Sequence, residues 1–228
     1  MLKQPTKASR IANLTDARYF AAWDVAWLGF CLDSSAAHFL RPQELMAIRE
    51  WVTGPQIVGE FGWQAPEEIR QTAELLRLDA VQVGPLLTAS QLVELADLTL
   101  FQELVLESHS NVDELRAHLT AAAPAVNYFL LNFAQNHLDW DSLQRERPFS
   151  TAELQALCRD FPVYLDLSLP LDQLDELLQR IRPLGLSVQG GEEEQVGFKS
   201  FDGLGERVEA MEVQEWGCVF PATRVCLA

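Results

Sequence analysis

The sequence predicts an α/β protein that forms a single (β/α)8 barrel, also called a TIM barrel. Short β-branched or apolar runs alternate with longer amphipathic segments, which is the pattern of repeated strand–helix units around a parallel sheet. Eight such runs occur, and no inserted domain, linker or low-complexity segment interrupts them. The 228 residues also suit this fold, whose smallest members have about 200 residues.

The eight predicted strands are short and rich in Val, Leu, Ile and Phe, as buried parallel strands are. Each is separated from the next by enough chain for a crossover helix. The predicted strands span residues 7–12, 25–31, 56–61, 80–83, 103–107, 127–133, 163–167 and 186–189.

Helices are predicted from apolar residues that recur at helical spacing, and several have clear start signals. Pro42 occupies a first helical turn, where its missing N–H costs nothing. Ser150 and Glu153 have the spacing of a capping box, and Asn111 precedes an acidic first turn. The predicted helices span residues 42–52, 65–77, 88–97, 111–123, 150–160, 171–181 and 202–214.

The barrel is predicted to cover residues 1–216, and residues 217–228 are expected to form an apolar C-terminal tail that packs back on it. The four cysteines lack the spacing of a disulfide framework or a zinc site. They are Cys31, Cys158, Cys218 and Cys226. The first two are expected to be small buried hydrophobes, whereas pairing of the last two stays open. No metal or cofactor is expected, because no glycine-rich nucleotide-binding fingerprint has the required spacing.

The charge composition disfavours two classes of binding partner. With 17 Lys and Arg against 33 Asp and Glu, the formal net charge is −16. Binding to nucleic acid or to an anionic membrane surface depends on basic residues, so both roles are disfavoured. The first residues do not resemble a signal peptide, and no apolar stretch is long enough to span a bilayer. We therefore expect a cytoplasmic protein.

Candidate site residues are found where the predicted strands end, because barrel enzymes carry their catalytic groups there. Arg10 is expected either to bind an anion or to pair with Asp166 or Glu60. The latter two could instead form a carboxylate pair for acid–base chemistry. Gln82 is either a structural hydrogen-bonding residue or a ligand contact. His109 and His137 follow strands five and six, but no spacing supports a metal site there.

The sequence resembles the phosphoribosylanthranilate isomerases of tryptophan biosynthesis in a register that runs almost from end to end. That family opens with Lys-Ile-Cys-Gly-Ile-Thr-Asn-Leu-x-Asp-Ala, and residues 7–17 here read Lys-Ala-Ser-Arg-Ile-Ala-Asn-Leu-Thr-Asp-Ala. Further matching segments follow in order. They are Leu-Gly-Phe at 28–30, Val-Gly-Glu-Phe at 58–61, Pro-Glu-Glu-Ile at 66–69, Leu-Asp-Ala-Val-Gln at 78–82, Leu-Asp-Trp at 138–140 and Gly-Phe-Lys at 197–199.

The resemblance implies an Amadori rearrangement of a phosphorylated aminoaldose, with a Cys general base after strand one and an Asp general acid after strand six. The matching catalytic positions here are Ser9 and Asn132. A serine hydroxyl is a much weaker acid than a thiol, so unassisted Ser9 is a poor proton acceptor. An amide has no acidic proton to give, although Asn132 can still donate a hydrogen bond.

The implied substrate-binding positions also depart from the family pattern. The family holds phosphate on glycine-rich turns after strands seven and eight, but Asp166, Leu167 and Ser168 replace the first of these turns. Gly190 and Gly191 survive in the second, followed at once by acidic residues. The full set of substrate-binding candidates is Lys7, Arg10, His38 in place of a family Arg, Gln82, Asp166, Ser168, Gly190 and Gly191.

Two functions follow from this pattern. The favoured one is a catalytically impaired or repurposed barrel that binds a small molecule at its mouth. The alternative is an active phosphoribosylanthranilate isomerase, or a related sugar isomerase, in which neighbours assist Ser9 and Asn132. Either a monomer or a homodimer is compatible with the sequence.

Overall fold

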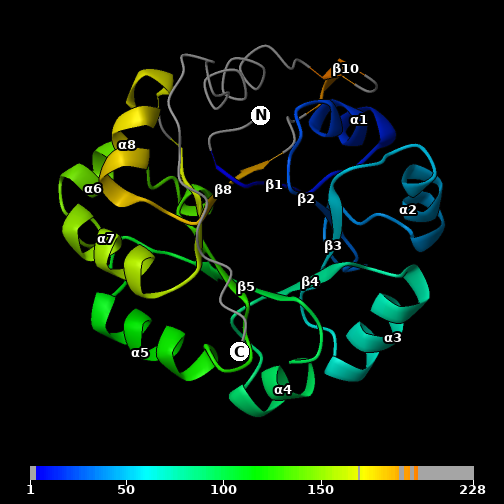
Figure 1. Ribbon diagram of the computed structural model, residues 1–228, viewed down its shortest axis with the longest axis horizontal. Coiled ribbons are helices and arrows are strands. Elements are labelled where there is room, and N and C mark those ends of the chain that lie inside the picture. The colour runs from blue at the N-terminus through cyan, green and yellow to red at the C-terminus, as the bar shows by residue number, and fades with distance from the viewer. Residues whose placement is uncertain (1–3, 169, 190–192, 196–197, 200–228) are drawn as a thin grey trace, which may run out of the picture.

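The computed structural model describes residues 4–168, 170–189, 193–195 and 198–199, and its centre is a closed barrel of parallel strands (Figure 1). The strands follow one another around the barrel in sequence order, and β8 closes it against β1. The prediction of a (β/α)8 barrel is confirmed. The strands are β1 (Thr6–Ser9), β2 (Trp27–Cys31), β3 (Gln56–Glu60), β4 (Ala80–Val83), β5 (Leu100–Val105), β6 (Tyr128–Asn132), β7 (Val163–Asp166) and β8 (Gly185–Gln189).

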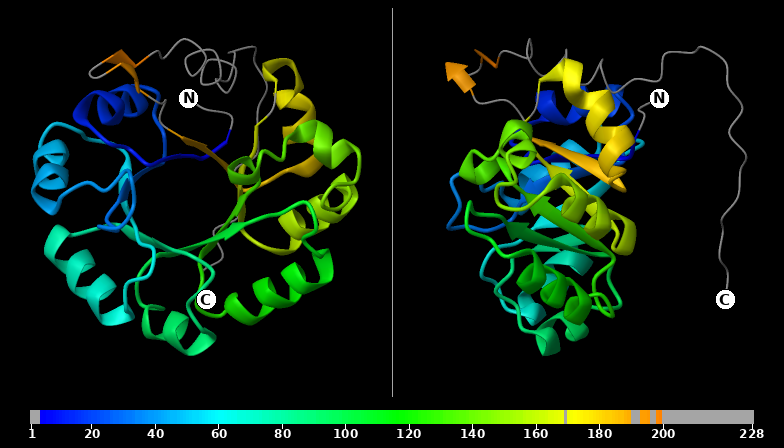
Figure 2. Two further views of the ribbon diagram at one scale, coloured as in Figure 1. Left: turned by 180° about the vertical axis from the view of Figure 1, so that it is seen from behind. Right: turned by 90° about the vertical axis from the view of Figure 1, so that its left-hand side faces the viewer.

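Helices form an outer ring around these strands (Figures 1 and 2). The predicted starts of three helices are confirmed. Pro42 is the first residue of α2, the Ser150 hydroxyl accepts a hydrogen bond from the backbone N–H of Glu153, and Asn111 caps α5. The helices are α1 (Leu14–Ala22), α2 (Pro42–Arg49), α3 (Pro66–Leu76), α4 (Ala89–Glu94), α5 (Val112–Ala122), α6 (Trp140–Gln144), α7 (Thr151–Asp160) and α8 (Leu174–Ile181), with 3-10 turns at Ala134–Asn136 and Leu171–Gln173.

Several predicted boundaries were wrong. The fifth strand begins at Leu100, three positions before the predicted start at residue 103, because Leu100 and Phe101 are buried strand residues. The first strand ends at Ser9 and not at residue 12, since Arg10 adopts a left-handed backbone with φ of 57°. Helices α1 and α6 were not among the predicted helices. The predicted helix at 202–214 and the tail at 217–228 lie outside the described residues.

Apolar side chains fill the amino-terminal half of the barrel. Trp27, Val58, Ala80, Phe101, Leu130 and Tyr164 form one buried cluster there, and Trp27 Nε1 donates a hydrogen bond of 3.1 Å to the Tyr164 hydroxyl. A second, larger cluster lies between the strands and the helices. This half of the barrel is therefore packed with largely apolar side chains, and a layer of polar side chains lies toward the carboxyl ends of the strands.

Two of the four cysteines lie within the described residues. Cys31 and Cys158 are buried free thiols, as predicted, and burial raises the pKa of Cys158 to about 12. Within the described ranges, no helix combines the length and apolar character that crossing a bilayer requires.

Candidate functional site

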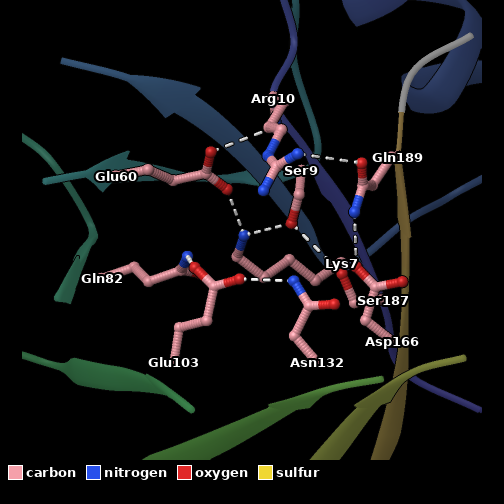
Figure 3. A network of polar contacts seen from close by, with 10 residues as sticks. All are labelled: Lys7, Ser9, Arg10, Glu60, Gln82, Glu103, Asn132, Asp166, Ser187 and Gln189. Atoms are coloured by element: carbon pink, nitrogen blue, oxygen red, sulfur yellow. Dashed lines mark hydrogen bonds and ion pairs between the residues drawn. The ribbon is translucent and has the colours of Figure 1, made fainter. Parts of the chain in front are cut away.

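A buried ion pair between β1 and β3 forms one side of the barrel mouth. Lys7 Nζ donates to Glu60 Oε1 at 2.5 Å, and the lysine is fully buried while Glu60 is 7% exposed (Figure 3). Gly29 on β2 leaves the space that this pair occupies, since a Cβ there would lie 2.1 Å from Glu60 Oε1 and 2.7 Å from Lys7 Nζ. Both charges are thus removed from water together, so each would be a buried charge without a partner if the other were lost.

Ser9, the predicted catalytic residue of β1, lies against this ion pair. Its hydroxyl accepts a hydrogen bond of 2.6 Å from Lys7 Nζ and lies 3.2 Å from the hydroxyl of Ser187 on β8. An ammonium group donates hydrogen bonds and accepts none, so this contact provides no acceptor for a serine proton. Ser9 is held in place by its neighbours, but none of these contacts makes it a base.

Asn132, the predicted catalytic residue of β6, is bound to a carboxylate that the sequence analysis missed. Its Nδ2 donates to Glu103 Oε1 at 2.6 Å, and its Oδ1 accepts from the backbone N–H of Gln135 at 2.9 Å. Gln82 Nε2 donates to the other oxygen of Glu103 at 2.9 Å. Glu103 therefore orients both amides of the mouth (Figure 3).

A third group joins β1, β7 and β8. Arg10 Nη1 donates to Gln189 Oε1 at 3.3 Å, and Gln189 Nε2 donates to Asp166 Oδ2 at 3.0 Å. Arg10 Nη2 also donates to Gln135 Oε1 at 3.3 Å. Burial raises the pKa of Asp166, with a smaller contribution from the nearby charge of Glu103, although the Gln189 hydrogen bond opposes this rise.

The sequence left open whether Arg10 pairs with Asp166 or Glu60, and whether these two acids pair with each other. The Arg10 guanidinium forms no ion pair with any described carboxylate, and only its backbone N–H contacts Glu60, at 3.1 Å. Glu60 and Asp166 belong to separate groups, because Glu60 contacts Lys7 and Asp166 contacts Gln189. Among the described residues, Arg10 therefore reaches Asp166 through Gln189 and Glu60 through its backbone N–H, and the two acids share no hydrogen bond.

The remaining predicted residues lie nearer the rim or away from it. His38 is exposed and lines the mouth cavity, and exposed Ser168 lines a neighbouring cavity beside Asp166. His109 lies outside the mouth and contacts Glu107, 3.1 Å away. Among the residues that the structure describes, no group of His, Cys, Asp and Glu could hold a metal ion. Gly190 and Gly191 lie outside the described residues.

Comparison with known proteins finds similarity at the level of the fold. The sequence matches no protein-family model and no curated protein. Among solved structures, phosphoribosylanthranilate isomerase from Thermus thermophilus matches with a TM-score of 0.70 at 24% identity, over 91% of this chain and 98% of that one. The chain shares the fold of the phosphoribosylanthranilate isomerases.

Two further structures show the extent of this likeness. A structure of monomers of the dimeric phosphoribosylanthranilate isomerase from Thermotoga maritima matches with a TM-score of 0.70 at 18% identity, over 91% of this chain and 98% of that one. A 3-hexulose-6-phosphate synthase also matches, with a TM-score of 0.61 at 11% identity, over 91% of this chain and 99% of that one. Because enzymes of different reactions share this fold, the assignment of function rests on the residues in the mouth.

Proposed function

We propose that this chain is a phosphoribosylanthranilate isomerase-like barrel that has lost the isomerase reaction and binds a small molecule at its mouth. The observation that carries the proposal is the bonding of Asn132, whose amide is held 2.6 Å from the Glu103 carboxylate at the position expected for a general acid. An amide has no acidic proton to supply, and here the amide N–H of Asn132 is already donated to the Glu103 carboxylate.

The position expected for the general base supports the same conclusion. The amino group that contacts the Ser9 hydroxyl belongs to Lys7, which is itself bound to Glu60. A general base needs a pKa near the working pH, and a serine hydroxyl lies far above it. Ser9 can accept a hydrogen bond from Lys7 and pass one to Ser187 or to a ligand, but it does not remove a proton from carbon.

Charge in the mouth disfavours the phosphorylated substrate. Asp166 stands at the turn where the resemblance implies phosphate-binding glycines, and Glu60 and Glu103 lie in the same polar layer. Asp33 also lines this cavity, so the four acidic residues set against Arg10 and the buried Lys7 give a formal charge of 2 − 4 = −2. A dianionic phosphate placed beside the Asp166 carboxylate would be repelled, and this repulsion is strong where water is excluded.

The mouth nevertheless retains the properties of a binding site. It contains a cavity of about 360 Å³ whose lining includes Arg10, Gln82 and Gln189, within the range of about 300–1,000 Å³ for small-molecule sites. A nucleic-acid or membrane partner is disfavoured by the net charge of −16. A soluble cytoplasmic protein, either monomeric or homodimeric, fits this proposal.

A second candidate, an active isomerase, is favoured by one contact. The 2.6 Å hydrogen bond from Lys7 would stabilise a Ser9 alkoxide if one formed. Genetic complementation separates the two candidates: the intact chain is expressed in bacteria that lack phosphoribosylanthranilate isomerase, beside an authentic enzyme. We expect no growth without tryptophan. Growth that depends on Ser9 would support the active isomerase.

A further inference from the structure

A second cavity lies beside the mouth, between the carboxyl ends of β7 and β8 and helix α8. Its volume is about 340 Å³, which is within the range of small-ligand sites. One end is polar and carries Arg10 and Asp166, whereas the apolar part is lined by side chains that include Leu165, Leu174, Leu177 and Leu186. A ligand that fills this cavity therefore needs a charged end and an apolar end.

The two charges at the polar end are held apart. Gln189 stands between them, accepting from Arg10 Nη1 at 3.3 Å and donating to Asp166 Oδ2 at 3.0 Å. Asp166 is only 6% exposed, and its Oδ1 accepts no hydrogen bond from any described residue. Charged groups that are largely buried require partners of opposite charge. Because Gln189 is neutral, both charges remain available to a ligand.

The backbone of Arg10 has a conformation that favours glycine. Its φ of 57° lies in the left-handed region, which ordinary L-residues rarely adopt and glycine adopts freely. The chain therefore carries a long cationic side chain where glycine would be less strained. Five other described non-glycine residues share this conformation, so it supports a role for Arg10 only together with the cavity that Arg10 lines.

We propose that this cavity binds a zwitterionic α-amino acid with an apolar side chain. Its carboxylate lies on the Arg10 guanidinium, its ammonium group donates to Asp166, and its side chain lies among the leucines. The proposal deepens the proposed function and rests on it, because the same strand ends cannot serve both this ligand and the phosphate of an isomerase substrate. Inorganic phosphate or a simple carboxylate would leave Asp166 unpaired and would be repelled by it.

Calorimetric titration of the full-length chain with L-leucine tests the proposal. We expect saturable binding at one site. Two analogues each lack one charge: 3-methylbutylamine lacks the carboxylate, and 4-methylpentanoate lacks the ammonium group. Each should bind at least about tenfold more weakly, as expected when a hydrogen bond to a charged group is lost. Equal binding of 4-methylpentanoate, or displacement of leucine by millimolar phosphate, would contradict the zwitterion assignment.

Variants locate the site. Arg10→Gly removes the guanidinium and suits the φ of 57°, and Asp166→Asn removes the carboxylate while retaining an oxygen for Gln189. Each variant should weaken leucine binding by at least about tenfold with an unchanged circular dichroism spectrum. Arg77→Gly is the matched control, because Arg77 has φ of 50° and lies at the end of α3. It should leave leucine affinity unchanged.

The two proposals can fail separately. Absence of leucine binding to a folded chain that also lacks isomerase turnover overturns the amino-acid site alone. Turnover of phosphoribosylanthranilate overturns the proposed function, whatever the titration shows.

Discussion

Asn132 and Glu103 share a hydrogen bond of 2.6 Å between β6 and β5, and Gln82 binds the other carboxylate oxygen at 2.9 Å. Each oxygen of the Glu103 carboxylate therefore accepts a hydrogen bond from one side-chain amide. An aspartate at position 132, which the resemblance implies for an isomerase, would instead set two carboxyl groups against each other. The acceptor that faces position 132, and not Asn132 alone, therefore favours an amide at this position.

We predict that Asn132→Asp destabilises the fold in a pH-dependent way. Two carboxyl groups at this distance cannot both ionise easily, so one holds its proton more tightly in the folded state than in the unfolded chain. Stability is then lost as pH rises above the unfolded value of about 4. Urea denaturation should show a deficit of about 1–3 kcal/mol at pH 7 that shrinks toward pH 4.5. Asn111→Asp, at the cap of α5, should show no such loss, because aspartate is an equally good cap.

We predict that Lys7→Met is strongly destabilising. It leaves the buried Glu60 carboxylate without its 2.5 Å partner, and breaking one side of a buried ion pair costs about 3–5 kcal/mol. The double variant Lys7→Met, Glu60→Leu should regain much of this loss in urea denaturation, because it removes both charges. Arg41→Ala, which breaks the exposed pair with Glu44, should have little effect. A Lys7 variant as stable as the parent would mean that the pair is not buried as described.

Gly29→Ala tests the space around the same ion pair. The new Cβ would lie 2.1 Å from Glu60 Oε1 and 2.7 Å from Lys7 Nζ, so the pair must move. We expect a loss of about 1–3 kcal/mol in urea denaturation. Gly84→Ala is the matched control, since no atom lies within 4 Å of the Cβ position there. Equal effects at both positions would show that the Lys7–Glu60 geometry does not depend on Gly29.

Asp166→Asn should stabilise the protein at neutral pH. Burial raises the pKa of Asp166 in the folded state, so the wild-type residue costs stability as pH rises above its unfolded value of about 3.9. The variant should exceed the parent in melting temperature at pH 7, and the difference should close toward pH 4. Asp139→Asn should show the opposite sign, because hydrogen bonds from Ser142 lower the pKa of Asp139. An Asp166 variant that is less stable at pH 7 would contradict the assigned cost of burial.

Much of the fold could be predicted from periodicity. The eight strands, the start of α2 and the caps of α5 and α7 follow from local patterns that tertiary packing reinforces. The error in β5 arose because Gln102 interrupts its apolar residues. Gln102 is fully buried and faces His118, 3.1 Å away, a contact with no local signature.

The site could be predicted only in part. Ser9, Gln82, Asn132 and Asp166 do lie together in the polar layer, because strand ends meet at one rim (Figure 3). The partner of each was not predictable, since Lys7 and Glu60 are separated by 53 positions and Asn132 and Glu103 by 29. Glu103 was overlooked because the predicted strand began there. Placing it two residues after Phe101 on the same inward face would have identified it.

The most direct test of the account measures the fluorescence decay of freshly generated phosphoribosylanthranilate in the presence of the intact chain, an authentic isomerase and the Ser9→Cys, Asn132→Asp double variant. We expect the intact chain to leave the decay at the rate of buffer alone. We expect the same of the double variant, because Asp166 still opposes the phosphate. Decay that accelerates in proportion to the intact protein, and that Ser9→Ala abolishes, would contradict the account and establish an active isomerase.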